Sequence, residues 1–221
     1  MLRYNAVLKN RSQYEECQEV LHRRGLPIHV DPAKNWDSLA CLNILENEKP
    51  VKENKVLDAG GEYYSSFLPQ LAMLGFIDLT CINILFEKTE RRGHVLYQRG
   101  DITHTAFADE YFDFIACLSV IEHGVNIERY FCEMSRILQN GGLLFTSTDY
   151  WQDPLEVQGK MAYGVPIKIF SRDDIVRFID IARSFGLRLV GTLDLECEEL
   201  AVNWKEFDLN YTFIYFLLRK Q

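Results

Sequence analysis

Apolar and polar positions alternate along the chain in two rhythms, and the change from one rhythm to the other marks the secondary structure. Near the N-terminus, apolar residues recur at helical spacing over residues 12–25 and again over residues 36–46. Ser12 followed by Glu15 is typical of a capping box at the start of the first helix. The pattern therefore predicts an N-terminal helical cap over residues 1–54, which we expect to act as a substrate lid.

From residue 55 onward, short β-type runs alternate with helical stretches. Such alternation predicts βαβ units and a mainly parallel sheet. The predicted strands are residues 55–59, 77–83, 94–98, 112–120, 142–148, 187–193 and 211–219, and the clearest helices between them are residues 65–75, 126–142 and 171–185. The final run is long and apolar, so we expect a last strand that lies antiparallel beside the fifth. The predicted fold class is α/β, a three-layer sandwich with a seven-stranded sheet, in a single domain of residues 1–221 whose core is residues 55–221.

Composition and charge narrow the class of protein. Hydrophobic residues make up 48% and charged residues 25% of the 221 residues, as in soluble globular proteins. No apolar run reaches the roughly 18 residues that a membrane helix needs, and no secretory signal is evident, so we expect a cytoplasmic protein. The six cysteines contain no CxxC pair and fit reduced thiols.

The net charge of -8 disfavours binding to nucleic acid or to an anionic membrane surface. The nearest basic patch is Lys88, Arg91 and Arg92, which we interpret as a solvated helix face. The histidines are scattered and H-E-x-x-H is absent, so no metal site is predicted.

In an open parallel sheet, ligands bind at the carboxyl ends of the strands. The first predicted strand runs into the sequence VLDAGG, where Gly60 and Gly61 allow the backbone to approach a ligand closely. Polar side chains end the strands that follow: Asn83, Asp101, Ser119 and Asp149. His123 follows the fourth strand, and its ordinary pKa near 6.5 suits a general base, although a packing role explains it as well.

Four stretches in this order, VLDAGG, GDI, FDFIACLSVIEH and RILQNGGLLFTSTDYW, resemble the class I S-adenosylmethionine-dependent methyltransferases of small molecules. The resemblance spans Lys55 to Trp151 and implies a Rossmann-like fold, S-adenosylmethionine as cofactor and methyl transfer as the reaction. It assigns the methionine end of the cofactor to Asp58 and the backbone of Ala59, Gly60 and Gly61, the ribose to Asn83, the adenine to Asp101 and Ile102, and the sulfonium region to Ser119.

The glycine loop departs from the family pattern. The family usually shows D-x-G-x-G-x-G, whereas Glu62 and Tyr64 replace the later glycines, and Asn83 replaces the usual acid. An amide forfeits a charge-assisted bond to the ribose, which could cost about 1.4 kcal/mol, a factor of ten in affinity. Glu62 can offset this loss by reaching the amino group of the cofactor. The departures leave open a catalytically degenerate binding protein.

The predicted catalytic base is His123, with Asp149 second. We expect the acceptor pocket among aromatic and histidine side chains, although ordinary lid packing explains these residues equally well: His29, Trp36, Tyr150, Trp151 and Tyr163. The segment YGVPIKIFSRDDI resembles stretches of polysaccharide-cluster methyltransferases, which favours a hydroxyl of a sugar or glycan precursor as the small-molecule acceptor. An N-methyltransferase of a natural product is the alternative. A nicotinamide-dependent oxidoreductase fits the sheet but not the loop, because G-x-G-x-x-G is absent.

Overall fold

The computed structural model describes residues 3–48, 50–157, 159–162 and 164–221. Its main sheet has the strand order β1-β12-β7-β6-β2-β3-β5-β4, and β10 and β11 also pair with β12. The strands of this sheet are β1 (Ala6–Val7), β2 (Lys55–Ala59), β3 (Asp78–Asn83), β4 (Glu90–Arg92), β5 (Val95–Arg99), β6 (Phe112–Leu118), β7 (Leu138–Tyr150), β10 (Leu187–Leu189), β11 (Val202–Trp204) and β12 (Leu209–Lys220).

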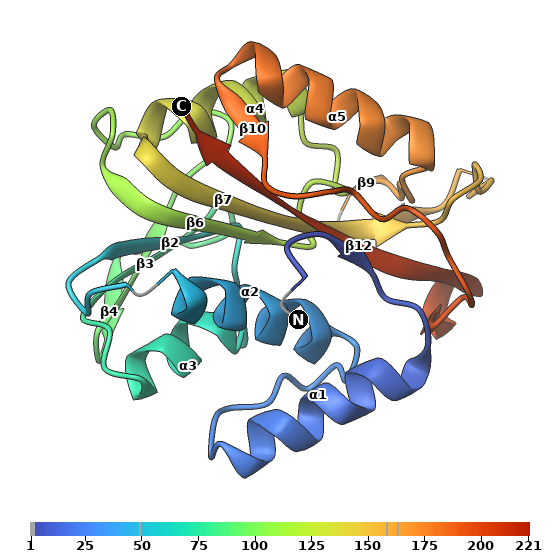
Figure 1. Ribbon diagram of the computed structural model, residues 1–221, viewed down its shortest axis with the longest axis horizontal. Helices are drawn as coiled ribbons and strands as arrows, with labels where there is room; N and C mark the ends of the chain where they lie inside the picture. The colour runs from blue at the N-terminus through green and yellow to red at the C-terminus, as the bar shows by residue number, and fades with distance from the viewer. Residues whose placement is uncertain (1–2, 49, 158, 163) are drawn as a thin grey trace.

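Helices cover both faces of this sheet (Figure 1). The helices α1 (Arg11–Arg23), α2 (Lys34–Asn47) and α3 (Phe67–Met73) lie on one side, and α4 (Ile127–Ile137) and α5 (Arg172–Ser184) lie on the other. One core layer packs Leu42 and Phe67 against the first face of the sheet, and the other packs Phe131 and Phe178 against the second. This confirms the predicted α/β three-layer sandwich.

The centre of the sheet is parallel, because β2 pairs in parallel with both β3 and β6, as β3 does with β5 and β6 does with β7. The last strand, β12, lies antiparallel to β7, with Thr212 opposite Tyr150. All seven predicted strands are present, and β1, β4 and β11 are short additions. Strand order reverses between β2 and β6, and in such folds this switch point is where ligands bind.

Two local predictions were wrong. The first helix is capped by Asn10, whose side chain accepts a hydrogen bond from the Gln13 backbone, whereas Ser12 lies inside the helix. The basic patch at Lys88, Arg91 and Arg92 is no helix face, since Glu90–Arg92 forms the edge strand β4 of a hairpin with β5. Backbone pairing with β5 overrides the short polar pattern that suggested a helix.

The N-terminal residues belong to the sandwich rather than standing apart from it. β1 pairs with β12 within the sheet, and α2 buries one side chain after another against the same core as α3. Two further strands, β8 (Met161–Ala162) and β9 (Val165–Pro166), form a small hairpin after β7. The predicted role of residues 1–54 as a substrate lid stays a prediction.

Candidate functional site

The glycine loop after β2 is shaped by close contacts that only glycine permits. Gly60 has a φ of 98°, and a Cβ atom there would lie 2.6 Å from the Val120 side chain. A Cβ atom at Gly61 would overlap the Asp58 carboxylate. The loop is anchored to the neighbouring strand, because the Gly60 N–H donates to the Ile82 carbonyl at 2.8 Å. The loop backbone is therefore packed closely between the Val120 side chain and the Asp58 carboxylate, which only glycine allows.

Asp58 is the most unusual group of this loop. Its side chain is only 1% exposed, and its Oδ1 atom has no hydrogen-bond partner among the described residues. Burial, together with the nearby charges of Asp37 and Glu62, raises the pKa of Asp58 to about 7. A buried, unsatisfied acceptor is costly, so this oxygen fits a site that receives a donor or a cation from a ligand.

Asn83 and Glu62 are arranged differently from the expected direct ribose contact. The Asn83 amide nitrogen donates to the carbonyl oxygens of Gly60 and Gly61 at 3.0 and 3.1 Å, and to Glu62 Oε1 at 3.2 Å. The Asn83 Oδ1 atom accepts from the Leu85 N–H at 2.9 Å. Asn83 therefore holds the loop in shape, and the carboxylate at this position of the site comes from Glu62.

The remaining predicted cofactor residues lie at the same edge of the sheet. Asp101 is exposed and uses Oδ1 to accept from both donors of Thr103 at 2.8 Å, while Ile102 is buried in the core beside it. Ser119 directly follows β6 in the left-handed region with a φ of 53°, and its Oγ atom is buried with no hydrogen-bond partner among the described residues. Strained backbone and unsatisfied buried groups concentrate at functional sites, and here both coincide in one residue.

A buried polar cluster that the sequence did not predict continues this edge toward β7 and β12. Asp37 on α2 accepts from Ser147 Oγ at 2.6 Å, and Glu122 accepts from Thr148 Oγ1 at 2.9 Å. Lys34 lies among these carboxylates with its ammonium 4.2 Å from the centre of the Phe213 ring. Burial lowers the pKa of Lys34, but the surrounding carboxylates raise this pKa above its usual value, so the Lys34 side chain stays cationic. The sequence feature that could have identified Asp37 as a buried polar residue is its position as an acid within the apolar helix pattern of residues 36–46.

The pKa values of the two predicted base candidates shift in opposite directions. Burial lowers the pKa of His123, so its imidazole is neutral at pH 7 and can accept a proton. Burial and the neighbouring Glu122 raise the pKa of Asp149 well above its usual range, and Asp149 also contacts the Tyr211 hydroxyl. His123 is neutral and half-buried, whereas the carboxyl group of Asp149 is buried and engaged with Tyr211 and Glu122, so the geometry favours His123.

The predicted acceptor-pocket residues are only partly brought together. The prediction that Trp36 and Tyr150 line the acceptor pocket is corrected, because both are buried in the core. Trp36 packs on Tyr215, and Tyr150 donates its hydroxyl to the Leu195 carbonyl at 2.8 Å. Trp151 is half-buried at the end of β7. Tyr163 lies outside the described residues.

His29 lies near the glycine loop, with its ring centre 5.8 Å from that of Tyr64. The N-terminal segment therefore reaches the mouth of the site. Val165 on β9 approaches from the other side, since a Cβ atom on Gly124, next to His123, would lie 3.2 Å from its Cγ1.

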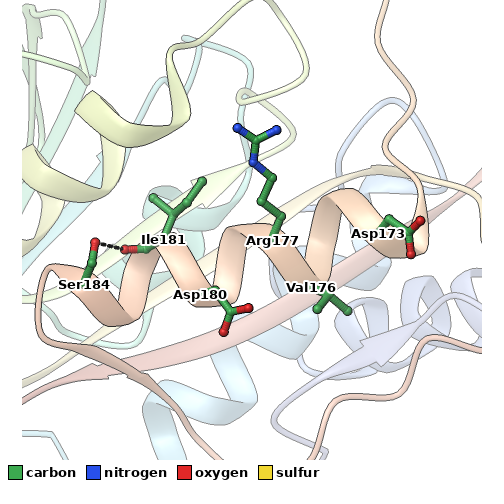
Figure 2. Close-up of a pocket in the computed structure, with 6 residues that line it drawn as sticks. All are labelled: Asp173, Val176, Arg177, Asp180, Ile181 and Ser184. Atoms are coloured by element: carbon green, nitrogen blue, oxygen red, sulfur yellow. Dashed lines mark hydrogen bonds between the residues drawn. The ribbon is translucent and has the colours of Figure 1, made fainter.

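Other surfaces of the molecule offer less chemistry. Figure 2 shows an open groove along α5, lined by residues of that one helix only: Asp173, Val176, Arg177, Asp180, Ile181 and Ser184. Over the described part of the chain, no three His, Cys, Asp or Glu side chains are grouped so as to hold a metal ion. None of the helices seen in the described ranges has the length and hydropathy to cross a membrane.

The carboxyl edge of the sheet therefore combines a glycine turn, a buried acid with an unsatisfied oxygen, a polar loop held by Asn83 and a neutral imidazole. Residues 59–146, which contain this edge, match the family model of a methyltransferase domain. This match and the fold together indicate a class I S-adenosylmethionine-dependent methyltransferase. Its cofactor is S-adenosylmethionine, and the unsatisfied Asp58 Oδ1 and the buried Ser119 Oγ fit the polar groups of that molecule.

Solved structures share the fold of this methyltransferase at low sequence identity. A proposed sarcosine dimethylglycine methyltransferase from Galdieria sulphuraria superposes with a TM-score of 0.65 at 16% identity, over 94% of this chain and 98% of that one. A geranyl diphosphate methyltransferase in complex with SAM gives a TM-score of 0.65 at 16% identity, over 94% and 90% of the two chains.

A third structure extends this comparison. An S-adenosylmethionine-dependent methyltransferase from Mesorhizobium loti gives a TM-score of 0.58 at 16% identity, over 86% of this chain and 99% of that one. Comparison with curated protein sequences gives no significant match. At these identities the structural likeness establishes the fold, and the acceptor must be argued from the site itself.

Proposed function

We propose that this methyltransferase modifies a hydroxyl group of a small molecule, a sugar or glycan precursor, with His123 as the general base. The observation that carries the proposal is the neutral, half-buried imidazole of His123 at the carboxyl edge of the sheet, beside the β8–β9 hairpin. A neutral hydroxyl must lose its proton as the methyl group arrives, and a neutral imidazole can accept that proton.

In this proposal Asp58 Oδ1 and the backbone of Gly60 and Gly61 hold the amino acid end of the cofactor. Asp101 and Ile102 hold the adenine, Asp101 through the carboxylate oxygen that the hydrogen bonds to Thr103 leave unused. Bound S-adenosylmethionine supplies an activated methyl group on a sulfonium, so the remaining task of the protein is alignment and deprotonation.

Glu62 takes over the ribose contact that the family pattern places after the second strand. Its carboxylate lies beside Asn83, where Asn83 Nδ2 donates to Oε1 at 3.2 Å and leaves the second oxygen of the acid for a hydroxyl. Burial raises the pKa of Glu62 while the Asn83 hydrogen bond lowers it. Glu62 and Asn83 thus exchange the roles of ribose acceptor and loop support.

The polar groups near His123 also support a hydroxyl-rich acceptor. Glu122, Asp149 and the Tyr211 hydroxyl form a hydrogen-bonded set whose members can donate and accept. The same carboxylates favour a second candidate, an amine of a natural product, because they would attract its ammonium form. We place the reaction in the cytoplasm, where the six free cysteines of the chain would stay reduced.

The test is transfer of an isotope-labelled methyl group to a panel of nucleotide sugars and a panel of amines. We expect label on a sugar hydroxyl, and we expect His123→Ala to lower turnover by about a hundredfold or more while the cofactor dissociation constant stays within about twofold. Turnover of the wild type should rise with pH and level off below pH 7, because the pKa of His123 is lowered.

His22→Ala, an exposed change on α1, is the matched control and should leave turnover unchanged. Label found on amines with all sugars inert would contradict the hydroxyl assignment. An equal loss of turnover and cofactor affinity in His123→Ala would show that His123 shapes the pocket instead.

A further inference from the structure

The cofactor edge contains a second buried carboxylate that the methyl-transfer chemistry does not use. Asp37, on α2, is 1% exposed. Its Oδ2 atom accepts from Ser147 Oγ, whereas its Oδ1 atom is buried with no hydrogen bond of normal geometry among the described residues. Helix α2 therefore delivers an unsatisfied acid into the interior from outside the family's sequence pattern.

Hydrogen bonds connect Asp37 to the end of β6. The Ser119 N–H donates to the Ser147 carbonyl at 3.1 Å and lies 3.2 Å from Ser147 Oγ, the same hydroxyl that donates to Asp37. Asp37 is thus one serine side chain away from Ser119, whose own Oγ is buried and unsatisfied. Two unsatisfied polar groups converge on the place where the sulfonium region of the cofactor is proposed to lie.

Asp37 also faces Asp58 across the interface between α2 and the sheet. Each is 1% exposed, and the charge of Asp37 helps to raise the pKa of Asp58. Both acids also act on the thiol of Cys41, which lies one helical turn beyond Asp37 on α2. The two carboxylates therefore share one poorly solvated region.

Positive charge is sparse in this region. Lys34 is the cation that acts on Asp37, yet no carboxylate among the described residues lies within ion-pairing distance of its ammonium, which instead lies over the Phe213 ring. Glu122 and Asp149 add further negative charge to the surroundings of Lys34. A bound cation would add to the single positive charge of Lys34, because burying carboxylates without a directly paired charge is unfavourable.

We propose that Asp37 is a specificity-determining residue. Its charge strengthens binding of the positively charged cofactor and does not strengthen binding of the neutral product. Methyl transfer would break the bond between the sulfur and the methyl carbon, join that carbon to the acceptor oxygen as His123 takes the hydroxyl proton, and leave the sulfur as an uncharged thioether. The attraction to Asp37 disappears at that moment, which favours release of the product. The inference rests on the proposed position of the cofactor over Gly60 and Gly61.

Calorimetric titration with three ligands tests this assignment: S-adenosylmethionine, S-adenosylhomocysteine and sinefungin, an analogue that carries an amine in place of the methylsulfonium. In Asp37→Asn, we expect S-adenosylmethionine and sinefungin to bind about tenfold more weakly and S-adenosylhomocysteine to change by less than about twofold. The asparagine keeps an acceptor for Ser147 and removes only the charge. Asp37→Ala should show the same loss of preference.

Two control variants separate the possible causes. Asp58→Asn should weaken all three ligands together, because the amino group that it contacts is common to them. Asp180→Asn, an exposed change of equal charge on α5, should alter none.

Equal changes for charged and neutral ligands in Asp37→Asn, or no change at all, would overturn the role of Asp37. Wild-type protein that binds none of the three ligands would overturn the proposed site as a whole.

Discussion

Two buried carboxylates on opposite faces of the sheet show how differently one chemical group can be used. Glu133, on α4, accepts hydrogen bonds from the N–H and hydroxyl of Thr105 at 2.7 and 2.6 Å, and from Arg136 at 2.7 and 3.0 Å. Burial raises the pKa of Glu133, but these hydrogen bonds outweigh that effect and lower the pKa to about 2. Asp58 is buried with one oxygen unsatisfied, and its pKa is raised to about 7.

The difference separates a structural acid from the acid that we propose to bind the cofactor. Glu133 joins the loop after β5 to α4, and each of its bonds favours the folded state. Asp58 opposes folding at neutral pH, because its charged form is favoured more in the unfolded chain than in the folded one. Stability lost at such a position can be recovered when a ligand binds.

The largest effect should come from Asp58→Asn. We expect the dissociation constants of S-adenosylmethionine and S-adenosylhomocysteine to rise by about a hundredfold, because a charge-assisted bond to the amino group is lost in a buried site. Calorimetric titration measures this change, with Asp180→Asn as the charge-matched control. Thermal unfolding of the ligand-free variant should occur at a higher temperature than in the wild type, and lower stability together with intact binding would make Asp58 a structural residue like Glu133.

Glu133→Ala should destabilise the fold and leave cofactor binding unchanged. Loss of several hydrogen bonds to charged partners should lower the free energy of unfolding by about 2–3 kcal/mol, measured by urea denaturation. The cofactor dissociation constant should stay within about twofold of the wild type. Glu128→Gln, an exposed change on the same helix, is the control.

The pH dependence of stability sharpens this comparison, because the two acids have opposite signs. The folded-state pKa of Glu133 is depressed, so its contribution is complete above the unfolded value near 4 and is lost as pH falls through about 2. The folded-state pKa of Asp58 is raised, so its cost appears above about pH 4 and grows until about pH 7. Equal stability of Glu133→Ala and wild type at neutral pH would contradict the structural role.

The smallest effect is expected for Glu62→Gln. An amide keeps the hydrogen bond to the Asn83 region but loses the charge, so both forms of the cofactor should bind about three- to tenfold more weakly. Equilibrium titration of both ligands measures the change. Glu87→Gln, an exposed change in the loop after β3, is the control. Unchanged binding in Glu62→Gln would show that a residue other than Glu62 makes the ribose contact.

The sequence by itself determined the order of the elements and the edge at which the site lies. Apolar runs and glycine turns follow from local periodicity, so residues 55–59 became β2 and the helix predicted over residues 171–185 formed as α5. The matching family model covers the same loops. Strand ends carry ligands in every fold of this topology, so the positions of Asp58 and Ser119 could be read from the pattern alone.

Only the tertiary structure decided which side chains face that edge and what their charges are. Asp37 meets Ser147 across 110 positions of sequence, so no local pattern could place it in the site. Trp36 and Tyr150 are aromatic residues of the kind that line pockets, but both are buried in the core. Periodicity shows which residues share a face of an element, whereas burial and hydrogen bonding depend on what packs against that face, and this packing made Glu133 a structural acid and left Asp58 unsatisfied.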